Sequence, residues 1–208
     1  IANNRHMMEM LATNRQKQPV DEIVDDLSEI EFQDLLQDIT DESQRFLEAT
    51  ALANNTAFRG MLEHGLFAFT RKLEVLLNAE RASLFLVEGD ELVLKVAANL
   101  DEIGEIRIPL GSGIAGAVAQ SGETIRIEDA YADPRFNREV DKKTGFKTRS
   151  ILSLPLKNMD GQVFGVAQLL NRQDGKPFSA DDEHRFAAFM QSIGVIFQTQ
   201  RDMANRGQ

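Results

Sequence analysis

The chain has 208 residues, an apolar fraction of 42% and a net charge of −10, so it can bury a core and suits one domain with an extension, or two small domains. The negative charge argues against a nucleic-acid partner, and the absence of cysteine excludes disulfides, thiol catalysis, thiolate zinc sites and thioether-linked chromophores. No run approaches the ~18 apolar residues of a membrane span and no secretory signal is visible, so we expect no membrane partner and a cytoplasmic setting.

The first 55 residues predict a helical extension or linker. The chain begins at Ile1 rather than Met, so we expect a piece of a longer protein, and we interpret the polar residues 1–20 as a loosely ordered end. Residues 21–48 are strongly acidic, and their apolar residues recur at helical spacing, which predicts one or two amphipathic helices that begin near Asp21 and Glu22. Their apolar stripe needs a partner, either the domain body or the same helix of a second chain, because an isolated helix of this length is marginal in water.

The predicted domain covers residues 56–201, and residues 202–208 form a tail or the start of an outgoing linker. A helix over 56–78 has a broad apolar face, which predicts packing on both a sheet and another helix. The hydrophobic period then changes to that of strands over 81–87, 91–98 and 105–108.

A glycine-rich stretch, Gly-Ser-Gly-Ile-Ala-Gly at 111–116, separates the third strand from a short apolar helix over 114–119. The first N–H groups of a helix have no partner inside it, so an anion or another strong acceptor is favoured here. Three interpretations stand side by side: one wall of a small-molecule pocket, a glycine-rich turn without a ligand, and a dinucleotide fingerprint. The last is disfavoured because that fingerprint needs a full helix and a parallel strand, whereas strand 124–128 follows almost at once.

Residues 129–149, here called the lid, form a polar connection that is long for a compact domain. Three aromatic residues, Tyr131, Phe136 and Phe146, argue against disorder. We therefore predict an ordered lid with one short helix, in which Tyr131 and Phe136 pack within the lid rather than stack on a ligand.

The last hairpin, 150–156 and 162–170, leads to a final helix capped by Ser179 that continues toward or past Gln200. The element order predicts the α+β class, with a six-stranded antiparallel sheet, long helices on one face, and the lid and short helix on the other. The concave space between sheet and lid is where a ligand is expected.

These residues resemble the GAF domain family over about 58–200. The most specific match is the tail motif of its cyclic-nucleotide-binding branch, which reads Asn171-Arg172, then Phe178, then Asp182-Glu183, with arginine in place of the usual lysine. The resemblance implies that this motif acts through architecture, and an ion pair from Arg172 to Asp182 would tie the last strand to the last helix.

The lid is similar to the tandem GAF domains of cyclic-nucleotide phosphodiesterases, and still more to those of cyanobacterial adenylate cyclases. The resemblance implies that the backbone N–H groups of Ile114 and Ala115 bind a cyclic phosphate. It also implies that Asp141, Thr144 and Thr148 contact the ligand from the lid. Ser83 and Gln168 would lie at the base or its surroundings. Two departures favour cAMP over cGMP. Ala97-Ala98 replace an aromatic residue and an acid of cGMP-selective relatives, and Gln168 replaces a Glu of some relatives. Asn137 stands where a relative has Tyr, so the resemblance does not decide whether this position makes a stacking or phosphate contact with the ligand.

The function predicted from these features is a regulatory sensor that binds cAMP or cGMP and relays lid closure through terminal helices to an output domain outside the chain. The parent protein could be an adenylate cyclase or a phosphodiesterase, and a homodimer through the terminal helices is expected. The alternative is a ligand-free GAF dimerisation module, in which the three lid residues are turn and capping residues and Ser83 is a core residue. No catalytic residues, metal site or resident cofactor are predicted, since His6, His64 and His184 lack metal-ligand spacing.

Overall fold

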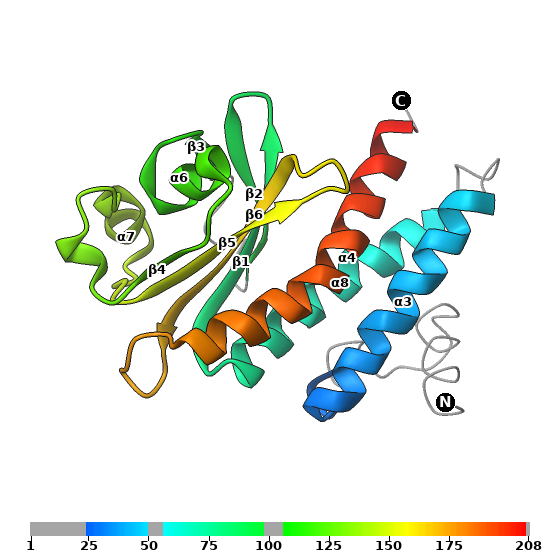
Figure 1. Ribbon diagram of the computed structural model, residues 1–208, viewed down its shortest axis with the longest axis horizontal. Coiled ribbons are helices and arrows are strands. Elements are labelled where there is room, and N and C mark those ends of the chain that lie inside the picture. The colour runs from blue at the N-terminus through cyan, green and yellow to red at the C-terminus, as the bar shows by residue number, and fades with distance from the viewer. Residues whose placement is uncertain (1–23, 50–55, 98–105, 207–208) are drawn as a thin grey trace. The chain divides into compact units, whose positions relative to one another are not determined.

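A computed structural model of the chain describes residues 24–49, 56–97 and 106–206 (Figure 1). The predicted N-terminal end and the predicted helix start at Asp21 and Glu22 lie outside the described residues. The elements in chain order are α3 (Glu29–Ala49), α4 (Thr56–Leu76), β1 (Ala79–Glu88), β2 (Glu91–Ala97), β3 (Arg107–Pro109), α6 (Gly113–Ser121), β4 (Ile125–Ile127), η1 (Ala130–Ala132), α7 (Arg138–Thr144), β5 (Ile151–Lys157), β6 (Val163–Arg172) and α8 (Ala180–Arg206). The chain divides into two compact units, Ile1–Lys72 with Gln191–Gln208, and Leu73–Met190.

In the first unit, α3 begins with a capping box. The Ser28 hydroxyl accepts from the Glu31 N–H at 3.4 Å, and the Glu31 carboxylate accepts from the Ser28 N–H at 3.0 Å. Four apolar residues of α3 are buried, namely Phe32, Leu35, Leu36 and Ile39, and the Phe32 ring lies 5.7 Å from the Phe69 ring of α4. Two partners were considered for the apolar residues of α3, the same chain and a second copy of it. The contact with α4 shows that the same chain covers these buried residues.

The second unit is built on a six-stranded sheet in the order β3-β2-β1-β6-β5-β4, in which each described pair of neighbouring strands is antiparallel. This confirms the predicted sheet and leaves no parallel βαβ unit for a dinucleotide fingerprint. The third strand begins at Arg107, two residues later than predicted, and β6 extends two residues further, to Arg172.

Both faces of the central strands are buried. On one face Phe85 and Val166 pack against Ala115 and Val118 of α6. Because side chains alternate along a strand, Leu84 points to the opposite face, where it is also buried. Figure 1 shows α6 and α7 on one side of the sheet and the first turns of α8 on the other, as predicted for the short and long helices.

The lid contains two short helices instead of the predicted one. The Asp129 carboxylate accepts from the Tyr131 N–H at 3.1 Å and begins η1. The Asn137 side-chain oxygen accepts from the Glu139 N–H at 3.0 Å and begins α7, which ends at Gly145 with a φ of +68°.

The glycine-rich turn folds back on the start of α6. Gly111 and Gly113 have φ values of +81° and +64°, and the Gly111 N–H donates to the Gly116 carbonyl at 2.9 Å. A Cβ atom at Gly116 would lie 2.6 Å from the Pro109 carbonyl oxygen. The third glycine is therefore needed for close packing of α6 against the end of β3.

Replacing Gly116 by alanine should destabilise the protein by about 1–3 kcal/mol, because the new methyl group meets backbone that cannot move without disturbing β3. The free energy of unfolding from urea denaturation measures this. Gly65→Ala is the matched control, since its Cβ would meet only the Phe69 ring, at 3.3 Å. Equal effects of the two substitutions would contradict the proposed contact.

Candidate functional site

A cavity of about 950 Å³, counting the space that opens to solvent, lies in the second unit between the sheet, α6 and the lid. All seven residues that the family resemblance singled out line it: Ser83, Ile114, Ala115, Asp141, Thr144, Thr148 and Gln168. Residues far apart in sequence are thus brought around one space, although their contacts with a ligand stay a prediction.

The start of α6 lies at this cavity, and its first N–H groups have no acceptor within the helix. Ser112 precedes the helix and its side chain makes no capping hydrogen bond. The Gly116 N–H donates to the Ser112 carbonyl at 3.1 Å, so the helix offers no acceptor to the preceding N–H groups of Ile114 and Ala115. Both residues are buried and line the cavity. An acceptor placed here would gain hydrogen bonds and a favourable helix dipole.

The floor of the cavity carries Ser83 of β1 and Gln168 of β6, which lie directly opposite each other in the sheet. They are only 9% and 8% exposed. Among the described residues, neither side chain has a hydrogen-bond partner in the protein. Because a buried polar group costs free energy unless it is paired, these side chains are suited to hold polar atoms of a ligand.

The lid residues, by contrast, already have partners within the lid. The Asp141 carboxylate accepts from the Thr148 hydroxyl and N–H, both at 2.7 Å, and from the Tyr131 hydroxyl at 3.1 Å. The Thr144 hydroxyl donates to the Val140 carbonyl at 2.9 Å. Partial burial and the Asp141 carboxylate raise the pKa of the Tyr131 phenol. The turn-and-capping interpretation therefore describes the hydrogen bonds of all three lid residues in this structure.

Aromatic contacts close the lid over the cavity. The Tyr131 and Phe136 rings lie 5.3 Å apart, which agrees with the predicted packing within the lid. The Arg81 guanidinium of β1 lies 3.9 Å from the centre of the Phe146 ring. Local sequence patterns do not predict this contact, because the two residues lie far apart in the chain.

Asn171, at the end of β6, fastens the end of the lid to the sheet. Its side-chain oxygen accepts from the N–H groups of Arg149 at 2.6 Å and Ser150 at 3.2 Å, and its amide donates to the Lys147 carbonyl and the Glu80 carboxylate, both at 2.9 Å. Arg149 also pairs with Glu80. Burial alone would raise the pKa of Glu80, but the bonds from Asn171 and Arg149 lower it overall.

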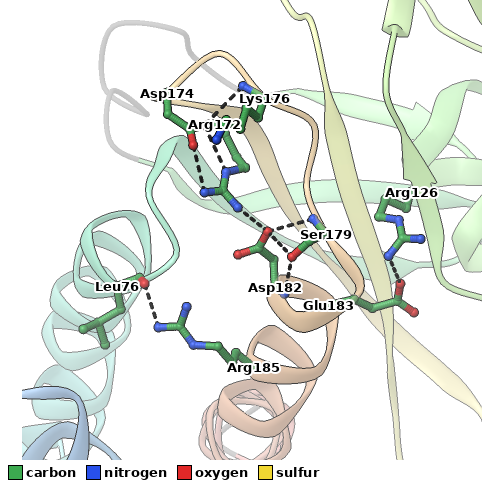
Figure 2. Close-up of polar contacts among 9 residues, drawn as sticks. All are labelled: Leu76, Arg126, Arg172, Asp174, Lys176, Ser179, Asp182, Glu183 and Arg185. Atoms are coloured by element: carbon green, nitrogen blue, oxygen red, sulfur yellow. Dashed lines mark hydrogen bonds and ion pairs between the residues drawn. The ribbon is translucent and has the colours of Figure 1, made fainter.

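The next residue, Arg172, holds the start of α8 (Figure 2). Its guanidinium donates to the Asp182 carboxylate at 2.5 Å and to Asp174 at 3.0 Å, which confirms the predicted ion pair between the last strand and the last helix. Asp182 also accepts from the Ser179 N–H and hydroxyl at 2.7 and 2.8 Å. Burial alone would raise the pKa of Asp182, but the hydrogen bonds from Ser179 and Arg172 have the larger combined effect, so the pKa is lowered.

Two further contacts fix the first turns of α8. Glu183 pairs with Arg126 of β4 at 3.2 Å, and Arg185 donates to the Leu76 carbonyl at the end of α4 at 2.9 Å. Phe178, just before the helix, is buried. The predicted tail motif is thus structural, and Asn171 adds the attachment of the lid, which the sequence analysis did not foresee.

Within the described ranges, no three His, Cys, Asp or Glu side chains gather as a metal site would require. The helices of that same part of the chain are each too short or too polar to cross a membrane.

Comparison with known proteins identifies a match to the GAF domain model over residues 61–197. The chain is 39% identical over 142 residues to the dual 3',5'-cyclic-AMP and -GMP phosphodiesterase 11 of Drosophila melanogaster, covering 60% of the chain. It is 35% identical over 167 residues to phosphodiesterase 11A of Takifugu rubripes, also a dual cyclic-AMP and -GMP enzyme, covering 74% of the chain. The matches span only 10% and 18% of those two relatives.

Among solved structures, the GAF domains of phosphoenolpyruvate-protein phosphotransferases are similar in fold. The protein from Coxiella burnetii superposes with a TM-score of 0.58 at 20% identity, covering 83% of this chain and 97% of that one. The protein from Acinetobacter gives 0.56 at 19% identity, covering 84% and 98%. At this identity the likeness concerns the fold alone.

Replacing Asn171 by aspartate should release the end of the lid. Aspartate keeps the acceptor for Arg149 and Ser150 but loses both donated bonds and faces the Glu80 carboxylate. Tryptic cleavage at the lid lysines should become about thirtyfold faster, from two lost hydrogen bonds of about 1 kcal/mol each. Asn137→Asp is the matched control, because its side chain only accepts, and equal cleavage of both variants would argue against the anchor.

Replacing Asp182 by asparagine should cost about 2–3 kcal/mol of stability at pH 7. The folded pKa of Asp182 is lowered, so its stabilisation is present above the unfolded pKa of about 3.9 and is lost as the pH falls through the folded value. The stability difference from the unmodified protein should therefore shrink toward pH 3 in denaturation curves. Asp181→Asn, in the exposed first turn, is the control and should change stability by less than about 0.5 kcal/mol. If the loss of stability in Asp182→Asn did not depend on pH, the charge-based explanation would be refuted.

Proposed function

Because this chain belongs to the GAF domain family, we propose that it is a regulatory sensor module that binds a cyclic nucleotide in the cavity under the lid. The observation that carries this proposal is the set of donors at the start of α6 for which the helix has no acceptor. They line the same cavity as the Ser83 and Gln168 side chains, which have no hydrogen-bond partner among the described residues. Two relatives whose names include cyclic-AMP and -GMP phosphodiesterase activity support the ligand class.

The cyclic phosphate would lie at the start of α6. A phosphodiester carries a negative charge and two free acceptor oxygens, which match the N–H groups of Ile114 and Ala115 and the positive end of the helix dipole. The buried position of both residues keeps water away from these bonds, which strengthens them.

The base would lie over the floor of the sheet, with cAMP favoured over cGMP. A Glu at this position, as in some relatives, would only accept and would suit the N–H groups of guanine, whereas the Gln168 amide also donates and can pair with the adjacent amino group and ring nitrogen of adenine. Ala97, at the end of β2, lines the cavity and adds no acceptor for the N–H groups of guanine. A ligand that also reaches Asp141, Thr144 or Thr148 would exchange their present bonds within the lid for bonds to itself.

The signal would pass from the lid to α8 through β6. Asn171 holds the end of the lid and the neighbouring Arg172 holds the start of α8, so a change in the lid acts directly on the strand end that fixes the helix. The terminal helices would relay this change to an output domain, of an adenylate cyclase or a phosphodiesterase, and pair in a homodimer. Ile30 of α3, 72% exposed, is an apolar side chain available for that pairing. We also propose that the module acts in the cytoplasm.

Titration calorimetry with cAMP and cGMP tests the proposal. The protein should bind both, cAMP more tightly, and Ser83→Ala or Gln168→Ala should each weaken binding of the preferred nucleotide about fivefold, the effect of one hydrogen bond of about 1 kcal/mol. Ser121→Ala, on the exposed end of α6, should leave affinity unchanged. If neither nucleotide produces heat or a thermal shift, the sensor proposal is wrong and the dimerisation module is left.

A further inference from the structure

Ser153, in the middle of β5, has a buried hydroxyl without a partner. Its side chain is 0% exposed, and its oxygen makes no hydrogen bond with any residue that the structure describes. Such a group costs free energy, because it has given up its bonds to water. The proposed function makes no use of Ser153, so the hydroxyl needs a physical explanation.

The sheet register places this hydroxyl beside Gln168. Ser153 of β5 lies directly opposite Gln168 of β6, which in turn lies opposite Ser83 of β1. Directly opposed residues share one face of the sheet, with Cβ atoms roughly 4.5–5.5 Å apart. On its other side, Ser153 is paired with Ile125 of β4, whose side chain is apolar. Gln168 is therefore the polar side chain nearest to Ser153 along this row.

We propose that Ser153 is a positioning residue for base recognition, an inference that rests on the proposed function. When a base fills the cavity, the Ser153 hydroxyl donates to the Gln168 side-chain oxygen. That oxygen has a second lone pair for the ligand, while the Gln168 NH₂ group is left to donate to the ligand. In the opposite orientation the hydroxyl would accept from the NH₂ group, and its own buried O–H hydrogen would be left without an acceptor. The hydroxyl therefore favours the orientation in which it donates.

A fixed amide selects between bases. Adenine presents an amino donor next to a ring-nitrogen acceptor, whereas guanine presents a carbonyl acceptor next to a ring N–H donor. The two bases therefore require opposite orientations of an amide that contacts this edge. Ser153 would not touch the ligand, but by orienting Gln168 it would make the site select between adenine and guanine.

The dissociation constants of cAMP and cGMP for Ser153→Ala test this inference. The cGMP-to-cAMP ratio of these constants should move toward one by about fivefold, and Ser153→Thr, which keeps a hydroxyl, should restore it. The matched control is Ser150→Ala: Ser150 is also buried, but strand alternation points it to the opposite face, so its ratio should not change.

An unchanged ratio in Ser153→Ala would overturn the inference while leaving the proposed function intact. Failure of the unmodified protein to bind either nucleotide would overturn both. If Ser153→Ala does not fold, the Gln168 side-chain amide is followed by NMR in the unmodified protein, with Gln168→Glu used for assignment. Saturating cAMP should give one protected pair of N–H resonances, and exchange-averaged resonances would refute a fixed amide.

Discussion

The end of strand β6 is the point on which the second unit depends. Asn171 adopts a left-handed conformation with a φ of +54°, is fully buried, and uses both ends of its amide to hold three backbone groups and one carboxylate. Asparagine tolerates this conformation better than most residues. The following Arg172 turns the other way and binds the first turn of α8. One dipeptide thus holds the lid and the last helix to the same strand.

The walls of the cavity differ in how far their polar groups are already hydrogen-bonded within the protein. The three lid residues that line the cavity have hydrogen-bond partners within the lid, with Asp141 as the centre of a small network. The start of α6 and the floor of the sheet, by contrast, carry donors and acceptors that bind no other described residue. Recognition would therefore come from the rigid sheet and helix, while the lid would contribute enclosure, since ordering a segment that already has its own bonds costs less conformational entropy.

Sequence periodicity predicted the class of fold, the six strands and the cavity between sheet and lid, because alternation and helical spacing report burial locally. The tail motif also predicted the Arg172–Asp182 pair. The capping box at Ser28 was visible in the Ser-x-x-Glu spacing and was overlooked. The Arg81–Phe146 contact and the Ser153–Gln168 pairing could not be predicted, because they depend on strand register and lid position, which local patterns do not encode.

The glycine at position 116 has a consequence for kinetics. Its contact with the Pro109 carbonyl joins α6 to the end of β3 with no room for adjustment, so the wall that carries the free N–H groups cannot swing aside to admit a molecule. The lid wall is closed over the cavity by side chains, through the contact of Arg81 with the Phe146 ring, and side chains can separate without moving α6 or β3. Entry and escape would both wait for that wall to lift, so residence time in the cavity would be governed by its opening rate more than by the strength of any single polar contact.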